Sequence, residues 1–140
     1  MITYVDTSSL LKLVIDEHGS EQAELIWESA EVSGSAVLVV VEARAALAAA
    51  TRGARLTAAQ HREAKHELAA LLDQLTIVEV TEDLIGQAAE LAETEGLRGY
   101  DAVHLAAALA IEANVLTSAD RALCDAAQRH GLHVANPLDG

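Results

Sequence analysis

The sequence is poor in cysteine, in long hydrophobic runs and in positive charge. Its 140 residues include one cysteine, Cys124, which cannot form a disulfide within the chain. The longest apolar runs, AVLVVV and ARAALAAA, are interrupted by charges and fall short of the roughly 20 residues that cross a membrane. Residues 1–20 lack the basic start and apolar stretch of a secretory signal. These absences predict a protein of the reducing cytoplasm without a membrane partner.

Positive charge is scarce: nine Lys and Arg residues stand against 22 Asp and Glu residues, which gives a formal net charge of −13. Such a surface repels nucleic acids and membranes. A polyanionic partner would therefore require either divalent cations held by clustered carboxylates or a local set of basic side chains. The candidates for that set are Lys12, Arg44, Arg52, Arg55, Arg98 and Arg121.

The hydrophobic pattern alternates between strands and helices, and the length fits one domain over residues 1–140. Apolar, β-branched segments predict strands, several of them continuous apolar runs typical of a sheet covered on both faces. The chain is thus expected to form a three-layer α/β/α sandwich with a mainly parallel sheet. Strands are expected at 1–6, 75–80, 114–118 and 132–136, and helices at 20–31, 57–74, 83–95, 100–112 and 119–130. Gly131 is expected to end the last helix.

The run SAVLVVVEARAALAAA begins with β-branched residues and turns Ala-rich. The period is therefore expected to change from strand to helix near Glu42. Glu42 interrupts apolar sequence on both sides, and a buried carboxylate is costly unless it is paired. Arg44 is too close in sequence to be its helical partner.

Four acids lie where a strand or loop passes into a helix: Asp6, Glu42, Asp101 and Asp120. Ligands of open parallel sheets bind at the carboxyl ends of the strands, so these acids are expected to converge. Each also has a structural explanation, because Asp101 and Asp120 are suited to helix N-termini and Asp6 to a turn. Clustered carboxylates suit Mg²⁺ or Mn²⁺, and such ions promote phosphodiester hydrolysis by activating a bound water.

The segments YVDTSSLLKL, GYDAVHLAAAL and VLTSADRAL, with Glu42 between them, resemble the ordered acidic motifs of the PIN-domain nucleases. The similarity covers nearly the whole chain and is greatest to the VapC-type ribonuclease toxins of toxin–antitoxin pairs. It implies that Asp6, Glu42, Asp101 and Asp120 are the metal-binding and catalytic acids. Ser8 matches a supporting hydroxyl, and either Ser118 or Thr117 matches a second one.

The same resemblance implies RNA cleavage with Mg²⁺ or Mn²⁺ that leaves 3′-hydroxyl and 5′-phosphate ends. It also implies a homodimer, held inactive by a VapB-type antitoxin whose C-terminal segment covers the site. His104 shares a helical face with Asp101, but a histidine among alanines is expected to pack or hydrogen-bond rather than bind a hard cation. Arg98 and Arg121 flank two of the acids, where each is suited to a substrate phosphate or to a surface ion pair.

Other ligand-binding classes match the residues less well. An adhesion module would need a hydroxyl at position 10, which is Leu10; a haloacid-dehalogenase phosphatase would need an acid at position 8, which is Ser8. A phosphate-receiver domain would need a lysine after the last strand, and a Rossmann domain its glycine fingerprint. The remaining alternative is a PIN-like domain that has lost catalysis and serves only to bind a metal or a partner.

Overall fold

Within residues 1–139, which the computed structural model describes, five strands form one parallel sheet. Their order across the sheet is β3-β2-β1-β4-β5, and all four neighbouring pairs are parallel. The carboxyl ends of the strands therefore share one edge. The strands are β1 (Ile2–Val5), β2 (Val32–Ala36), β3 (Thr76–Val78), β4 (Val115–Thr117) and β5 (His133–Ala135).

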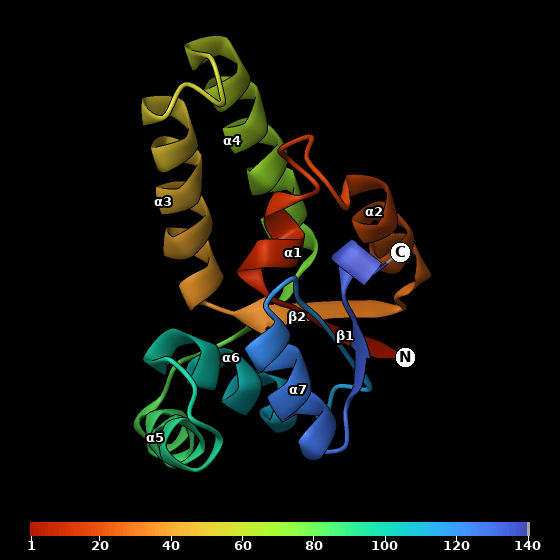
Figure 1. Cartoon of the computed structure of the whole chain (residues 1–140), viewed down its shortest axis with the longest axis vertical. Coiled ribbons are helices and arrows are strands. Elements are labelled where there is room, and N and C mark those ends of the chain that lie inside the picture. The colour runs from red at the N-terminus through yellow and green to blue at the C-terminus, as the bar shows by residue number, and fades with distance from the viewer. Residues whose placement is uncertain (140) are drawn as a thin grey trace.

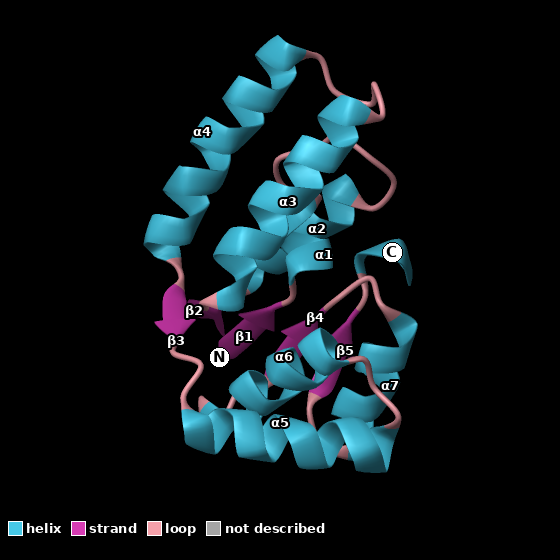
Figure 2. Cartoon of the chain, turned by 90° about the vertical axis from the view of Figure 1, so that its left-hand side faces the viewer, coloured by secondary structure: helices cyan, strands magenta, loops and turns pink. Residues whose placement is uncertain are grey.

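Helices cover both faces of this sheet and make three layers (Figures 1 and 2). One core joins the sheet to three helices through Leu84, Ala106 and Leu123; the other joins it to the remaining layer through Leu10, Leu47 and Leu68. The predicted α/β/α sandwich is confirmed. The first layer holds α5 (Glu82–Glu95), α6 (Gly99–Ala110) and α7 (Arg121–Arg129); the second holds α1 (Thr7–Leu11), α2 (Ser20–Ser29), α3 (Leu38–Arg52) and α4 (Ala58–Gln74), and a short 3-10 turn follows at Pro137–Asp139.

The strand prediction for the second apolar run was wrong in position. The strand is the less apolar Val32–Ala36, and the run that begins at Val37 enters α3. Gly34 lets β2 approach the α6 layer, because a Cβ there would lie 2.9 Å from Ile111 Cδ1. Val39 is buried at the start of α3, so packing outweighs the preference of β-branched residues for strands. Glu42 accordingly lies inside a helix rather than directly after a strand.

Helices α3 and α4 form a long hairpin that projects from the sheet (Figure 1). Leu47 of α3 and Leu68 of α4 belong to the same buried cluster and hold the two helices together. Thr57 begins α4 with a capping box, in which its side chain accepts from Gln60 N–H and Gln60 accepts from Thr57 N–H. We call residues 38–74 the α3–α4 hairpin.

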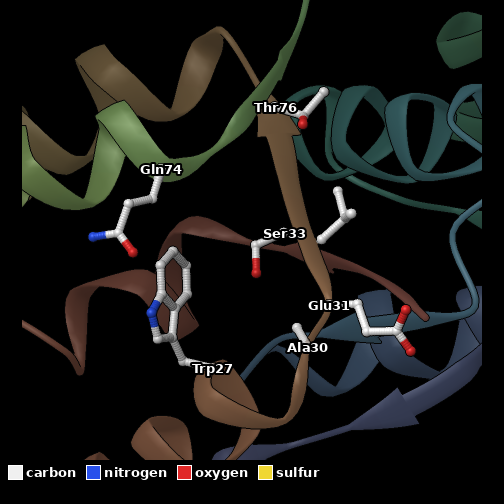
Figure 3. A pocket seen from close by; sticks show the side chains of 7 residues that line it. Trp27, Ala30, Glu31, Ser33, Gln74 and Thr76 are labelled. Carbon is white, nitrogen blue, oxygen red and sulfur yellow. The ribbon is translucent and has the colours of Figure 1, made fainter.

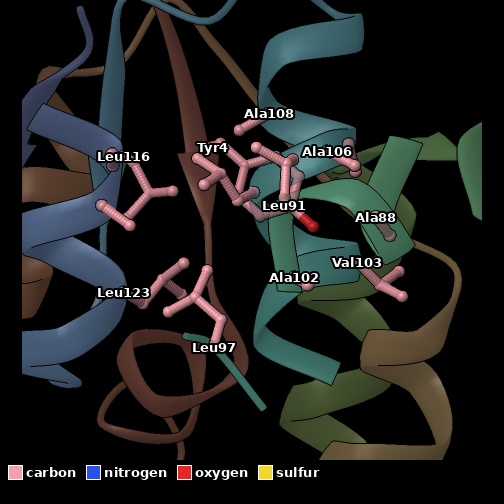
Figure 4. Close-up of a cluster of buried hydrophobic side chains, with 14 of the residues drawn as sticks. Tyr4, Ala88, Leu91, Leu97, Ala102, Val103, Ala106, Ala108, Leu116 and Leu123 are labelled. Atoms are coloured by element: carbon pink, nitrogen blue, oxygen red, sulfur yellow. The ribbon is translucent and has the colours of Figure 1, made fainter. Parts of the chain in front are cut away.

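Helix α6 is the most buried helix of the other layer. Its alanines allow close approach to the sheet, and Ala102, Ala106 and Ala108 belong to the same buried cluster as Tyr4 of β1 (Figure 4). The predicted glycine at the end of α7 is confirmed, because Gly131 has φ +89° immediately after the last turn. No helix among residues 1–139 is both long and apolar enough to cross a membrane.

Candidate active site

Asp6 lies at the carboxyl end of β1, at the N-cap of α1, and is 5% exposed. Its Oδ2 accepts hydrogen bonds from the hydroxyls of Ser8 and Ser118, each at 2.7 Å. The two hydroxyls are themselves held by the turn before α7, since Ala119 N–H donates to Ser8 Oγ and Asp120 N–H donates to Ser118 Oγ, both at 2.9 Å. These contacts fix the Asp6 carboxylate in one orientation.

The structure distinguishes the two hydroxyls that the sequence left open. Ser118 contacts Asp6, whereas Thr117 Oγ1 lies 3.0 Å from Ser9 Oγ in a buried pair between β4 and α1. The β4 main chain also reaches the site, because Asp6 N–H donates to the Thr117 carbonyl at 3.0 Å. Thr117 therefore supports the scaffold, and Ser118 belongs to the carboxylate site.

Glu42 is held by two neighbours that the sequence did not identify as its partners. Thr7 Oγ1 donates to Glu42 Oε1 at 2.8 Å, and His104 Nε2 lies 2.6 Å from the same oxygen. The His104 imidazole is also hydrogen-bonded to β1, because its Nδ1 lies 2.7 Å from the Tyr4 hydroxyl. His104 thus does hydrogen-bond, as expected, but its partner is one of the candidate site acids.

The direction of these bonds follows from Glu42, because an ionised carboxylate can only accept and therefore takes its hydrogen bond from His104 Nε2–H. A neutral His104 then has an unprotonated Nδ1, which accepts from the Tyr4 hydroxyl. The Tyr4 oxygen in turn accepts from Ala36 N–H at 2.9 Å. Burial keeps the pKa of the Tyr4 hydroxyl well above its ordinary value, so it stays a donor.

His104 and Glu42 shift each other's pKa in opposite directions. Burial acts to lower the pKa of His104, but its hydrogen bond to Glu42 and the charges of Asp6, Glu42 and Asp101 outweigh burial and raise it. Burial likewise acts to raise the pKa of Glu42, but the bonds from His104 and Thr7 outweigh it, so its pKa lies below the usual range. His104 Nε2 is also 3.6 Å from Asp6 Oδ1, beyond hydrogen-bond distance, so the imidazole is bonded to Glu42 and lies beside Asp6.

Arg98 bridges Asp101 and Asp120. Asp120 caps α7, since its Oδ1 accepts from Leu123 N–H at 3.0 Å, and its Oδ2 accepts from Arg98 Nη2 at 2.6 Å. Arg98 Nε donates to Asp101 Oδ2 at 2.9 Å. The helix-capping explanation is therefore true of one oxygen of Asp120, whereas Asp101 makes no cap bond at the start of α6.

The charges of these acids shift the pKa values of neighbouring groups. Burial raises the pKa of Asp101, and the charges of Asp120 and Asp6 raise it further against the opposing effect of Arg98. The carboxylates in turn raise the pKa of the Arg98 guanidinium, with its hydrogen bond to Asp101 as the main cause. A positive charge in addition to that of Arg98, placed beside Asp101 and Asp120, would reduce the repulsion among the carboxylates.

Carboxylate and hydroxyl oxygens are the ligands that Mg²⁺ and Mn²⁺ prefer, so the donor chemistry of Asp6, Glu42, Asp101 and Asp120 fits such a cation. The geometry is not that of a preformed site: in the described part of the chain, no three acidic, histidine or cysteine side chains already stand at metal-binding spacing. Arg98 occupies the position between Asp101 and Asp120. Cation binding there requires the guanidinium to move aside.

Arg121 lies apart from the acids, although it follows Asp120 in sequence. Its Nη2 pairs with Asp139 Oδ1 at 3.1 Å, and both side chains are largely exposed. Of the two flanking arginines, only Arg98 therefore contacts the carboxylates, while Arg121 forms the surface ion pair that was the other alternative.

A pocket at the opposite edge of the sheet has a single acidic residue in its lining and no cluster of carboxylates (Figure 3). It lies where β2 and β3 begin and is lined by Trp27, Glu31, Ser33, Gln74 and Thr76 among others. Trp27 is partly buried and packs against the hydrophobic core of the α3 layer. The acids instead gather at the carboxyl ends of β1 and β4.

The PIN domain model matches residues 3–129 of this chain. The chain belongs to the PIN-domain family. Two curated relatives from strains of Mycobacterium tuberculosis, Ribonuclease VapC45 and Ribonuclease VapC49, are each 38% identical over 136 residues, which is 96% of this chain and 94% of theirs.

Solved structures of low sequence identity share the fold of this PIN domain. FitAcB from Neisseria gonorrhoeae superimposes with a TM-score of 0.74 at 20% identity, covering 98% of both chains. A toxin–antitoxin complex from Klebsiella pneumoniae gives a TM-score of 0.67 at 17% identity, covering 96% of this chain and 97% of that one. The resemblance inferred from the four acidic segments is confirmed at the level of the family and the fold.

Proposed function

We propose that this PIN-domain protein is an endoribonuclease that uses Mg²⁺ or Mn²⁺ to hydrolyse RNA phosphodiester bonds, leaving 3′-hydroxyl and 5′-phosphate ends. One observation carries the proposal: Asp6, Glu42, Asp101 and Asp120 come from four separate elements and gather at one edge of the sheet. Two relatives at 38% identity carry the name ribonuclease, which supports the same activity.

The four carboxylates are the proposed cation ligands. When bound, the cation supplies a water of lowered pKa and offsets negative charge on the leaving oxygen. The protein's own part is to fix the carboxylates. Ser8 and Ser118 hold Asp6, and the α7 N-terminus holds Asp120 through Leu123 N–H.

His104 and Thr7 position the fourth acid. Both reach Glu42 Oε1, so this oxygen is directed by α1 and α6. The pKa of Glu42 lies below its usual value because these hydrogen bonds outweigh burial, which keeps the carboxylate ionised at neutral pH. An ionised acid is the form that binds a cation. His104 is therefore a positioning residue and not a proposed ligand.

The proposed biological role is that of a VapC-type toxin controlled by a VapB-type antitoxin. The names of the two relatives and the fold shared with a toxin–antitoxin complex support this role. The family resemblance further supports a homodimer that acts on RNA in the cytoplasm. Light scattering on the purified protein, alone and with its antitoxin, tests both assemblies.

Metal dependence and product chemistry are tested together on total cellular RNA. Purified, antitoxin-free protein is incubated with Mg²⁺, with Mn²⁺ or with EDTA, and the fragments are ligated to adaptors that require a 5′-phosphate. We expect discrete fragments, ligatable without kinase treatment, only where a divalent cation is present. Cleavage that persists in EDTA, or folded protein that cuts no RNA with either cation, would contradict the proposal and favour a binding module.

A further inference from the structure

The α3–α4 hairpin differs in charge from the rest of the molecule. Residues 38–74 hold five Lys or Arg and four Asp or Glu residues, a net charge of +1. The remaining residues hold four basic and 18 acidic side chains, a net charge of −14. The excess negative charge of this protein therefore lies entirely outside the hairpin. The hairpin cations are Arg44, Arg52, Arg55, Arg62 and Lys65.

The basic residues outside the hairpin are all neutralised by carboxylates. Arg98 pairs with two acids of the candidate site, and the other three each have one acidic partner: Lys12 with Glu17 at 3.0 Å, Arg121 with Asp139 at 3.1 Å and Arg129 with Glu95 at 2.6 Å. Lys12 is also buried and donates to the His18 carbonyl. None of these four is available to a polyanion without breaking an ion pair.

The five hairpin cations show the opposite pattern. All five side chains are exposed, and within residues 1–139 none of them forms an ion pair with a carboxylate. They are distributed along the hairpin, with Arg44 and Arg52 on α3, Arg55 in the connection, and Arg62 and Lys65 on α4. Unpaired cations on an otherwise acidic protein are the groups that a phosphate backbone contacts.

The hairpin is continuous with the candidate active site. Helix α3 begins at Leu38 and carries Glu42 in its second turn, so the site lies at the base of the hairpin. Helix α1, which follows Asp6, packs against this base, because Leu10 and Val39 share a buried cluster. From this base, α3 and α4 extend away from the sheet (Figures 1 and 2). An RNA strand along the hairpin reaches the carboxylates from the least acidic part of the surface.

We propose that the α3–α4 hairpin is the docking arm for the phosphate backbone of the RNA substrate, with its five unpaired cations as the contacts. This inference rests on the proposed ribonuclease function. It assigns substrate binding to the hairpin and leaves Arg98 and the carboxylates to the site at its base. The contacts are electrostatic, so they hold RNA without reading its sequence.

The test uses two variants with the same net charge. Arg52→Gln/Arg55→Gln removes two cations from the hairpin; Gln87→Glu/Gln128→Glu adds two carboxylates on the exposed surfaces of α5 and α7. Both are made in an Asp101→Asn background to prevent cutting. Binding of a fluorescein-labelled single-stranded RNA of mixed sequence is measured by anisotropy over a series of KCl concentrations at constant Mg²⁺.

For single strands, each phosphate contact contributes a slope of about 0.7 in log K against log salt, so losing one contact weakens binding about 5-fold near 0.1 M salt. We expect the hairpin variant to lose about 25-fold in affinity and to show a shallower salt slope. The control variant should lose much less and keep its slope. Equal losses in the two variants, or an unchanged affinity in the hairpin variant, would overturn the docking arm.

The same substitutions in the wild-type background separate this inference from the function on which it rests. We expect the hairpin variant to raise KM for RNA cleavage and to leave kcat near that of the unsubstituted protein. If the unsubstituted protein cuts RNA and the hairpin variant has the same KM, the docking arm is wrong and the ribonuclease stands. If the hairpin binds RNA as expected but no variant cuts it, the ribonuclease is wrong.

Discussion

His104 Nε2 lies 2.6 Å from Glu42 Oε1, and this contact links α6 to α3 across the carboxyl edge of the sheet. The imidazole is 1% exposed, and its other nitrogen is bonded to Tyr4 in the central strand. The orientation of Glu42 is therefore set by the core of the protein. A carboxylate held in this way needs little rearrangement to bind a cation.

Replacing His104 should cost both stability and activity. His104→Phe leaves the Tyr4 hydroxyl without its acceptor and removes one of the two donors to Glu42, so we expect the free energy of unfolding to fall by about 2 kcal/mol. The cleavage rate should fall about 10-fold or more, because Glu42 loses its orientation. Urea unfolding and single-turnover cleavage measure the two effects. His104→Gln, which retains a donor amide, should recover part of both; equal behaviour of the two variants would exclude a positioning role.

Arg98 should compete with the divalent cation. Its guanidinium pairs with Asp101 and Asp120, so a cation must displace it. We expect Arg98→Ala to bind Mn²⁺ more tightly in calorimetry and to melt at a lower temperature without metal, because the two acids then repel each other unscreened. Arg121→Ala is the matched control, since Arg121 pairs with Asp139 away from the site. Weaker Mn²⁺ binding by Arg98→Ala would show instead that Arg98 supports the metal-bound state.

Glu95 should give the fold an acid-sensitive contact that involves none of the candidate site acids. It accepts from Arg129 Nε at 2.6 Å and from His130 Nε2 at 2.9 Å, joining α5 to the end of α7. The Arg129 hydrogen bond is the main cause that lowers the pKa of Glu95 from its ordinary value of 4.5. A lowered pKa in the folded state means that stabilisation is present above pH 4.5 and is lost as the pH falls through the folded-state value.

The corresponding test is a pair of melting curves. Glu95→Gln should melt below the unsubstituted protein at pH 7, and the difference should shrink as the pH is lowered past the range in which Glu95 takes up its proton. Glu93→Gln, on the exposed side of the same helix, should leave the melting temperature unchanged at both ends of the range. A Glu95→Gln deficit that is independent of pH would exclude the ion pair as its cause.

Much of the fold and the position of three acids follow from sequence patterns. Asp6, Asp101 and Asp120 lie at helix starts, where polar residues next to apolar runs mark the boundary. The beginning of α3 could not be predicted from these patterns. Val37–Val41 has the composition of a strand, and it becomes helical through burial of Val39. Local preference alone does not show which of two adjacent segments the sheet will use.

Contacts between residues far apart in the chain were the other feature that the sequence could not predict. The sequence placed His104 on the face of Asp101, but its partner Glu42 is 62 positions away on another helix. The choice between Thr117 and Ser118 also depended on tertiary structure, since one hydroxyl meets Ser9 and the other meets Asp6. Charge segregation to the hairpin was visible in the sequence only once the helices that form the hairpin were known.

The most direct test of the central claim compares two single carboxylates in one RNA cleavage assay. Asp101→Asn removes a site acid, whereas Asp125→Asn removes an exposed acid of α7 and changes the net charge by the same amount. With both variants shown to be folded and supplied with Mn²⁺, we predict that Asp125→Asn cuts RNA at the unsubstituted rate and that Asp101→Asn gives no metal-dependent fragments. Cleavage by Asp101→Asn at the rate of Asp125→Asn would contradict the assignment of the active site.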